Sequence, residues 1–136
     1  MAKPYRLIDF PASDTGNGTL AMFQKGGPKG VIPFDIKKVL VVSGMKSEDV
    51  RGNHAHRETQ EVIVAIRGGC DFTIDDGTTK HSVRLEGMKK GLFLPAQVWR
   101  TFTNFQKDTI LLLIADQEYD EKEYVRSYEE FCKLVS

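Results

Sequence analysis

The sequence predicts an all-β protein: a small β-barrel that ends in one short C-terminal helix. Three observations predict it. Helical periodicity is absent before residue 120, short apolar runs recur along the chain, and turn-forming residues separate them. Many short strands spaced in this way are typical of a sandwich or a barrel. The chain has 136 residues, the size of one ordinary domain, so we predict a single domain over residues 1–136.

Eight apolar runs are predicted strands. In chain order they cover 19–24, 36–42, 62–67, 71–74, 79–85, 91–94, 99–105 and 110–115. The clearest hairpin joins 70–74 to 78–85 through Asp75-Asp76-Gly77, because Asp-Gly tolerates the positive φ angles of a tight turn. The run 110–114 is apolar at every position, which places it in a central strand covered on both faces.

The C-terminal tail has a different pattern. Tyr124, Tyr128, Phe131 and Val135 recur at helical spacing. Asp120 precedes them and is a suitable N-cap residue. The tail therefore predicts one short helix within residues 120–135.

The charge balance excludes some classes of partner. The 19 basic and 19 acidic residues give a net charge of zero, so no broad positive field favours nucleic acid or an anionic membrane. No apolar run approaches the ~20 residues of a membrane span. The first residues lack the apolar stretch of a secretory signal, so we expect a cytoplasmic protein. Cys70 and Cys132 lack the spacing of a zinc knuckle, and we expect both to be reduced.

His54-Ala55-His56 is the most informative triplet in the chain. In a strand, side chains at i and i+2 share a face, so the two imidazoles project together. Glu61 and Gly68 follow at the spacing His-x-His-x4-Glu-x6-Gly, which is that of the first cupin motif. That spacing favours a cupin-type jelly-roll β-barrel with the site in its cavity. The alternative is an exposed His-x-His strand without a role.

The second cupin motif is altered, because Arg100 stands where a histidine is usual. Arginine stays protonated and cannot ligate a metal. Two kinds of site therefore remain open. His54, His56 and Glu61 could hold a metal with open coordination positions. Without a metal or another cofactor, which is the reading we favour, the histidine pair could move protons, since imidazole titrates near pH ~6.5.

Three further side chains are candidate substrate contacts. Arg51 and Arg100 carry guanidinium groups, which suit an oxyanion or a phosphate. Trp99 could supply an apolar wall. The remaining histidine, His81, lies in a polar strand and is expected at the surface.

These residues resemble those of a known family, the dTDP-sugar 3,4-ketoisomerases. The run Arg51-Gly52-Asn53-His54-Ala55-His56 resembles the Arg-Gly-x-His-Ala-His signature of that family. The similarity continues through 75–77, 91–93, 98–100 and 119–121. It ends in Tyr124-Val125-Arg126-Ser127-Tyr128 and Phe131, which resemble the Tyr-Ile-Arg-x-Tyr-x-x-Phe ending of the family. The resemblance spans nearly the whole chain.

The resemblance implies a homodimeric isomerase that needs no metal. Such an enzyme moves the keto group of dTDP-4-keto-6-deoxyglucose from C4 to C3 through an enediol, in deoxysugar biosynthesis such as that of the O-antigen of lipopolysaccharide. It implies that His54 and His56 are catalytic, and we expect His56 to remove the C3 proton and His54 to relay a proton between the sugar oxygens. Arg51 would steady the enediolate or the pyrophosphate. The predicted strand 19–24 could pair across a dimer.

Three positions depart from the family pattern. The aromatic pair that usually follows Ile-Lys-Arg is absent at Leu40 and Val41, which removes a phenol. A usual glutamine is Glu61, and an N-terminal substrate contact, often Arg or Tyr, is Asn17. These changes leave open a different keto-sugar, another product configuration at C4, or a non-catalytic protein that binds sugar nucleotides.

Overall fold

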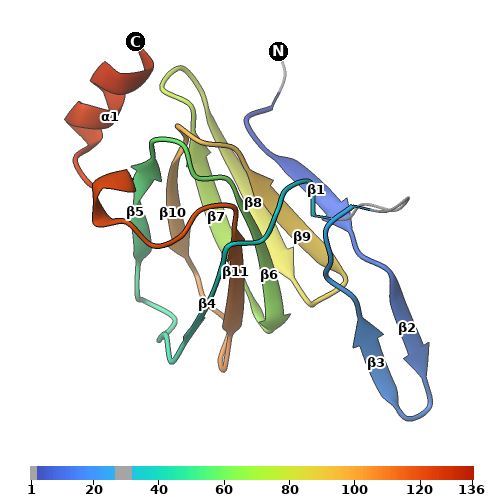
Figure 1. The fold of residues 1–136 in the computed structure, drawn as a ribbon. Helices are drawn as coiled ribbons and strands as arrows, with labels where there is room; N and C mark the ends of the chain where they lie inside the picture. Colours follow the sequence, from blue (N-terminus) through green and yellow to red (C-terminus); the bar gives the residue numbers. More distant parts are fainter. Residues whose placement is uncertain (1–2, 27–31) are drawn as a thin grey trace.

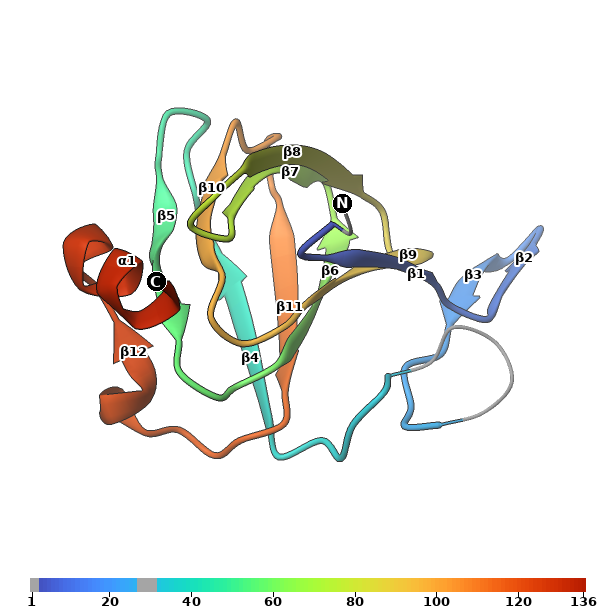
Figure 2. The same ribbon diagram turned by 90° about the horizontal axis from the view of Figure 1, so that it is seen from above.

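Two five-stranded sheets form the body of the protein. The structure is a computed structural model and describes residues 3–26 and 32–136. One sheet has the strand order β1-β9-β6-β11-β4 and the other the order β12-β5-β10-β7-β8. They curve around a common interior as the two halves of a barrel, and a hairpin, β2-β3, projects from it (Figures 1 and 2). This confirms the predicted all-β fold with a short C-terminal helix.

The elements follow one another in this order along the chain: β1 (Arg6–Asp9), β2 (Ala12–Thr15), β3 (Gly18–Ala21), β4 (Lys38–Ser43), β5 (Arg51–His56), β6 (Glu61–Arg67), β7 (Gly69–Asp75), β8 (Lys80–Glu86), β9 (Lys90–Leu94), β10 (Trp99–Thr103), β11 (Ile110–Ala115), the 3-10 helix η1 (Glu121–Glu123), β12 (Tyr124–Val125) and α1 (Tyr128–Val135). Every strand pairing within the sheets is antiparallel.

Each of the eight predicted strands has a counterpart. The predicted hairpin is β7-β8, whose turn has Gly77 at φ 95° and a hydrogen bond from Asp76 N to Thr79 O. The apolar run 110–115 is β11, which pairs with both β6 and β4 and is therefore central, as predicted. Of the other four strands, β5 contains the histidine triplet, which the sequence analysis treated as part of a strand. The sequence analysis missed β1, β2 and β12, since runs of two to four residues are too short to show a periodicity.

The predicted start of the C-terminal helix is wrong. The helix begins at Tyr128, and the side chain of Ser127 caps it by accepting a hydrogen bond from Glu130 N. Asp120 caps the single turn η1 instead, and Tyr124 lies in β12. Pairing with β5 holds Tyr124 in a strand, and periodicity along the chain cannot reveal such a tertiary contact.

The core fills the space between the sheets. Ile63, Phe72, Leu92 and Leu111 come from both sheets and are fully buried there. The N-terminal segment covers the outer face of the β1-β9-β6-β11-β4 sheet with a second cluster, which contains Ile8, Phe10, Ile32, Phe34, Val62, Val64 and Ile114. Both sides of this sheet are therefore apolar along β6 and β11, which explains their continuous hydrophobic sequences.

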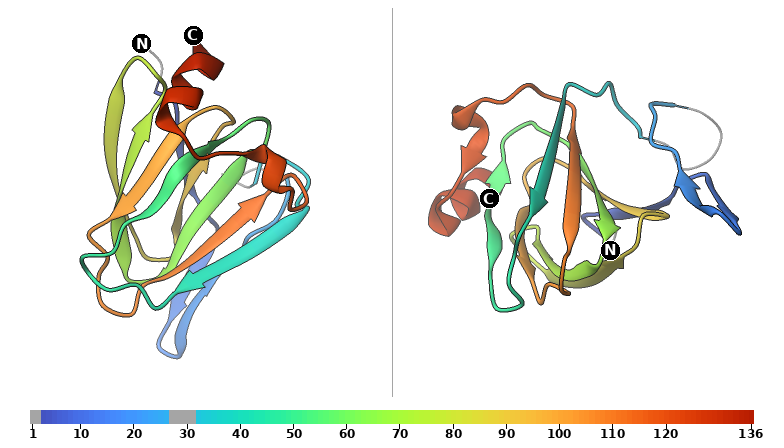
Figure 3. Two further views of the ribbon diagram at one scale, coloured as in Figure 1. Left: turned by 90° about the vertical axis from the view of Figure 1, so that its left-hand side faces the viewer. Right: turned by 90° about the horizontal axis from the view of Figure 1, so that it is seen from below.

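Helix α1 closes the side of the barrel opposite the β2-β3 hairpin, beside β5 and β12 (Figure 3). Phe131 is fully buried against Ala55 and Val125. Tyr128 donates a hydrogen bond from its hydroxyl to Asp75 Oδ2 at 2.5 Å. Cys70 and Cys132 are both free thiols. In the described part of the chain, neither the length nor the hydropathy of any helix suits a membrane span.

We predict that Phe131→Ala lowers the free energy of unfolding by about 3–5 kcal/mol, because it leaves a cavity under α1. Chemical denaturation followed by tryptophan fluorescence measures this, since Trp99 lies 5.8 Å from the Phe131 ring. Lys133→Ala on the exposed side of α1 is the control and should change stability by less than about 0.5 kcal/mol. Equal effects of the two substitutions would show that Phe131 does not anchor the helix.

Candidate active site

A β-bulge near the start of β5 sets the direction of the signature side chains. His54 lies opposite Arg100 and Gly52 opposite Thr101, so Asn53 is an extra residue without a partner on β10. Gly52 and Asn53 both have positive φ, at 88° and 54°. A Cβ atom at position 52 would lie 2.7 Å from Arg100 O, so only glycine fits there.

The bulge also decides which residues share the inner face. Without it, Arg51 and His54 would point to opposite faces, because they are three residues apart. With the extra residue, Arg51 lies opposite Phe102, whose side chain belongs to the core between the sheets. Arg51 therefore lies on the same face as His54, but at the exposed end of the strand.

The two histidines lie side by side, as their spacing predicts. Their ring centroids are 4.9 Å apart and the rings are nearly perpendicular. His56 is 1% exposed, whereas His54 is only partly buried. Nδ1 of His54 lies 3.1 Å from the carbonyl oxygen of Gly52. A carbonyl oxygen only accepts, so Nδ1 carries the hydrogen and Nε2 of the neutral ring keeps a lone pair.

Next to the histidine pair, Glu61 and Arg100 form an ion pair across the interior of the barrel. Glu61 comes from β6 in one sheet and Arg100 from β10 in the other. Arg100 donates a hydrogen bond from Nη1 to Glu61 Oε1, and both side chains are almost completely buried. His56 Nε2 lies 3.6 Å from the same carboxylate oxygen, which is an ion-pair distance but too long for a hydrogen bond.

The buried charges set the protonation of the site. Burial would raise the pKa of Glu61, but the charge of Arg100 and the neighbouring His56 side chain lower it to about 2. Burial, followed by the positive charge of Arg100, lowers the pKa of His54 from 6.5 to about 4. At neutral pH the site thus contains an ionised carboxylate, a guanidinium and a neutral His54, which can accept a proton.

Several buried polar atoms of the site have no hydrogen-bond partner among the described residues. They are Nδ1 and Nε2 of His56 and Nη2 of Arg100. Buried polar groups are almost always paired in native proteins, and the exceptions are common at functional sites. These unpaired nitrogens therefore mark the site as a candidate for binding a polar ligand.

Not every predicted site residue lies beside the histidine pair. Arg51, His54, His56, Glu61 and Arg100 share the interior side of the barrel. Trp99 precedes Arg100 in β10 and points to the opposite face, where its ring packs against Tyr128 and Phe131. The interpretation of Trp99 as a cavity wall is therefore wrong, because alternation along the strand directs it under α1.

Asn17 also lies away from the histidine pair of its own chain. It is exposed in the turn of the β2-β3 hairpin, which projects beyond the barrel on the side away from α1 (Figures 1 and 2). His81 lies partly exposed on β8 and hydrogen-bonds Thr79 Oγ1 at 3.1 Å. It is thus partly exposed rather than fully at the surface, and β10 and β7 separate its strand from β5.

The structure adds Tyr124, which the sequence analysis assigned to the helix. Its ring centroid lies 5.0 Å from that of His54 and 4.6 Å from that of His56. Lys38 Nζ lies 6.0 Å from the Tyr124 centroid. Tyr124 is the first residue of the Tyr-Val-Arg-Ser-Tyr ending, so the resemblance could have pointed to it.

The alternative metal triad is not assembled. Within residues 3–26 and 32–136, no group of three or more His, Cys, Asp or Glu side chains is arranged to hold a metal ion. Glu61 is directed instead to Arg100, and a fixed guanidinium next to His54 and His56 would repel a divalent cation. The set His54, His56 and Glu61 therefore does not fit a metal centre.

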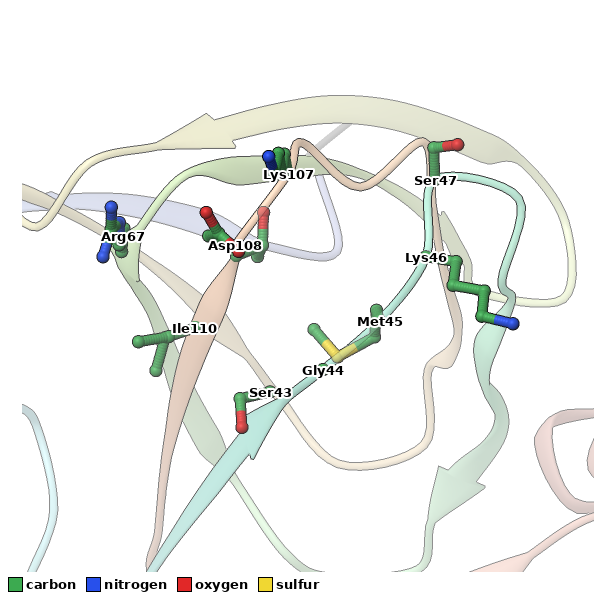
Figure 4. Close-up of a pocket in the computed structure, with 10 residues that line it drawn as sticks. Ser43, Gly44, Met45, Lys46, Ser47, Arg67, Lys107, Asp108 and Ile110 are labelled. Carbon is green, nitrogen blue, oxygen red and sulfur yellow. The ribbon is translucent and has the colours of Figure 1, made fainter.

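A separate hollow of about 600 Å³ lies at the other end of the barrel (Figure 4). It is lined by 43–47, Arg67 and 107–110. These residues include the end of β4 and β6 and the start of β11, whereas the histidine pair lies near the start of β6. None of the predicted site residues lines this hollow, so it is distinct from the histidine site.

Comparisons with known proteins agree on one family. A family model described as FdtA, WxcM-like, C-terminal, matches residues 3–136. The TDP-4-oxo-6-deoxy-α-D-glucose-3,4-oxoisomerase of Aneurinibacillus thermoaerophilus is 30% identical over 131 residues, which are 96% of this chain and 92% of the relative.

Solved structures of the same kind superpose along the whole chain. The TDP-fucose-3,4-ketoisomerase WlaRA of Campylobacter jejuni is 34% identical, with a TM-score of 0.88 over 98% of this chain and 97% of its own. A histidine-to-asparagine mutant of the 3,4-ketoisomerase QdtA of Thermoanaerobacterium thermosaccharolyticum, in complex with TDP-4-keto-6-deoxyglucose, is 26% identical. Its TM-score is 0.90 over 99% of this chain and 96% of its own.

We predict that Glu61→Gln lowers the free energy of unfolding by about 3–5 kcal/mol at neutral pH, because it leaves the Arg100 charge buried without a counter-ion. Because folding lowers the pKa of Glu61, the wild-type contribution is complete above about pH 4.5 and is lost as the pH falls through about 2. The difference between wild type and variant, measured by urea denaturation, should therefore shrink over that range.

The control is Glu118→Gln, which removes an exposed carboxylate outside the site. It should cost less than about 0.5 kcal/mol at any pH. A Glu61→Gln protein as stable as wild type at pH 7 would contradict the role of the pair.

Proposed function

This chain belongs to the FdtA family (WxcM-like, C-terminal) and is an isomerase of the dTDP-sugar 3,4-ketoisomerase type, and from that premise we propose that His54 and His56 move the keto group of dTDP-4-keto-6-deoxyglucose from C4 to C3. The observation that carries the proposal is the set of unpaired buried atoms on His56 and Arg100, next to a neutral His54. A substrate with adjacent keto and hydroxyl groups can pair with these atoms.

The structure favours His54 as the base that removes the carbon proton, which reverses the roles expected from the sequence. His54 is the more accessible of the two rings, and its Nε2 keeps a lone pair because Nδ1 donates to Gly52 O. His56 is fully buried and its Nε2 faces Glu61. A buried imidazole beside a carboxylate suits a proton relay, because the carboxylate stabilises the imidazolium that forms transiently.

The reaction conserves every atom of the sugar. His54 Nε2 takes the proton from C3, a C3–C4 double bond forms, and the C4 oxygen gains the negative charge. His56 passes a proton to the C4 oxygen and takes one from the C3 hydroxyl. The protonated His54 then returns a proton to C4, and the electrons of the C3–C4 double bond form the new C4–H bond while the ketone forms at C3. The two histidines end in their starting protonation states.

Arg100 serves as the electrostatic partner of the enediolate. Its Nη1 is engaged by Glu61, while Nη2 has no partner among the described residues. A fixed guanidinium that faces the developing charge needs no reorganisation during the reaction. Arg51, at the exposed end of β5 on the same face, is placed to bind the pyrophosphate.

A homodimer would account for Asn17. The free edge of β3 and the exposed Leu20 and Met22 suit pairing with a second chain. A hairpin that extends away from its own barrel could then place Asn17 at the sugar-binding site of the partner. The configuration of the product at C4 and the cytoplasmic location stay predictions.

The test is incubation with dTDP-4-keto-6-deoxyglucose in deuterated water, followed by NMR. We expect wild type to exchange the C3 hydrogen and to form the 3-keto isomer. His54→Asn should abolish C3 exchange, since it removes the base, whereas His56→Asn should stop isomer formation and leave slow C3 exchange. Both variants should still bind dTDP.

His81→Asn is the matched control and should keep wild-type turnover, because that ring lies outside the site. C3 exchange at the wild-type rate in His54→Asn would refute the assignment of the base. Binding of dTDP without any exchange in wild type would favour the non-catalytic alternative.

We predict that the protein is a dimer and that Leu20→Asp, which places a charge on the exposed face of β3, converts it to a monomer. Size-exclusion chromatography with light scattering measures the mass of each species. Ser47→Asp, the same change of charge in an exposed loop, should leave the dimer intact. A wild-type mass of 15.3 kDa would argue against the dimer.

A further inference from the structure

The orientation of His56 is not fixed by hydrogen bonds. A functional imidazole is usually held by a hydrogen bond at the ring nitrogen that does not react. Neither nitrogen of His56 has a hydrogen-bond partner among the described residues, and Glu61 Oε1 lies 3.6 Å from Nε2. Because the ring is almost completely buried, packing against its neighbours must hold it in place.

Tyr124 is the neighbour that touches both rings. It lies directly opposite His56 in the β12-β5 pairing, and opposed residues of antiparallel strands project from the same face. Since His54 and His56 share that face, the phenol ring meets both imidazoles, with centroids 5.0 Å and 4.6 Å away. The three rings form one aromatic group in which Tyr124 bridges the two histidines.

The backbone around Tyr124 is fixed at two points. Before it, the carboxylate of Glu123 accepts hydrogen bonds from Glu58 N at 2.9 Å and from Thr59 N and Oγ1 at 2.8 and 2.6 Å. After it, Val125 is fully buried against Phe131. The ring therefore cannot shift along β5 without breaking these contacts.

The outer side of the ring is covered by charged groups. The guanidinium of Arg126 lies 4.5 Å from the ring centroid, and Glu121 holds it with a hydrogen bond at 3.0 Å. Lys38 Nζ lies 6.0 Å from the centroid. Attraction between these cations and the ring helps to hold the Tyr124 ring in its position beside the histidines.

We propose that Tyr124 is a positioning residue for this isomerisation: its ring, rather than its hydroxyl, holds His54 and His56 in their working geometry and shields them from water. The proposal rests on the proton-transfer function proposed above. Tyr124 also gives the site an aromatic wall from β12. On β4, the aromatic pair that is usual in the family is replaced by Leu40 and Val41.

The charged groups around His54 influence its pKa, which is the quantity that a pH profile would report. The groups that face it are Arg100 on β10, His56 on β5, Glu61 on β6, Glu121 in η1 and Tyr124 itself. Burial is the largest cause of the lowered pKa of His54. Removing the ring of Tyr124 admits water, so the pKa of His54 should rise toward 6.5.

The experiment compares Tyr124→Phe, which keeps the ring, with Tyr124→Leu, which removes it. We expect Phe to retain kcat within about twofold, and Leu to lower kcat about 10- to 100-fold with KM changed by less than about threefold. The acid limb of the pH profile should move to higher pH by roughly one unit in Leu and stay in place in Phe.

Two controls separate positioning from folding. Tyr5→Leu removes a phenol that packs against the core 5.8 Å from His81, away from the histidine pair, and should leave kcat and the acid limb unchanged. Tyr128→Leu loosens the attachment of α1 through Asp75 and should lower thermal stability without moving the acid limb. An acid limb that moves equally in Tyr124→Leu and Tyr128→Leu would overturn the proposal, since loosening alone would then suffice.

Imidazole titration by NMR, without substrate, tests Tyr124 independently of the proposed reaction. A raised pKa of His54 in Tyr124→Leu but not in Tyr124→Phe would support the positioning role even if wild type showed no turnover. Unchanged histidine titration in Tyr124→Leu, or a loss of kcat in Tyr124→Phe as large as in Leu, would overturn it. Absence of turnover in wild type would refute only the proposed function.

Discussion

Glu61 on β6 and Arg100 on β10 join the two sheets through an ion pair that lies inside the barrel and is almost completely shielded from water. Two isolated charges could not be buried there, because the desolvation of each would cost several kcal/mol. As a pair they link the two strands, while one guanidinium nitrogen of Arg100 and both ring nitrogens of His56 have no hydrogen-bond partner among the described residues. The positive charge of Arg100 lowers the pKa of Glu61 and, after burial, contributes to the lowered pKa of His54.

The same two residues favour the proposed proton transfer over metal binding. In a metal-binding cupin site, a glutamate at this position would face a cation with the histidines. Here the carboxylate of Glu61 accepts a hydrogen bond from the neighbouring guanidinium of Arg100 instead. In the proposed mechanism, the guanidinium, which stays protonated, is the electrostatic partner of the anionic intermediate. The histidines stay free to accept and return protons.

Two local features bring the other groups to this pair. The bulge at Gly52 and Asn53 rotates the start of β5, so that Arg51 and His54 share a face despite their odd spacing. The C-terminal segment returns to the far edge of β5 and adds Tyr124 to the same face. The site is therefore built from β5, β6, β10 and β12, of which only β5 and β6 are neighbours in sequence. Packing of α1 on β5 stabilises the arrangement.

The sequence by itself determined the all-β class, the order of the main strands and the histidine pair, because these follow from local patterns with periods of two residues and from turn residues. It also identified Glu61 and Arg100 as unusual, but it could not show that they pair, since they are 39 residues apart. Only the tertiary structure showed that Trp99 packs under α1 and that Tyr124 lies in a strand beside the histidines and not in a helix. It also showed that Asn17 lies away from the histidines of its own chain. Strand pairing and the bulge decide which face a side chain takes, and neither is encoded in the spacing of one segment alone.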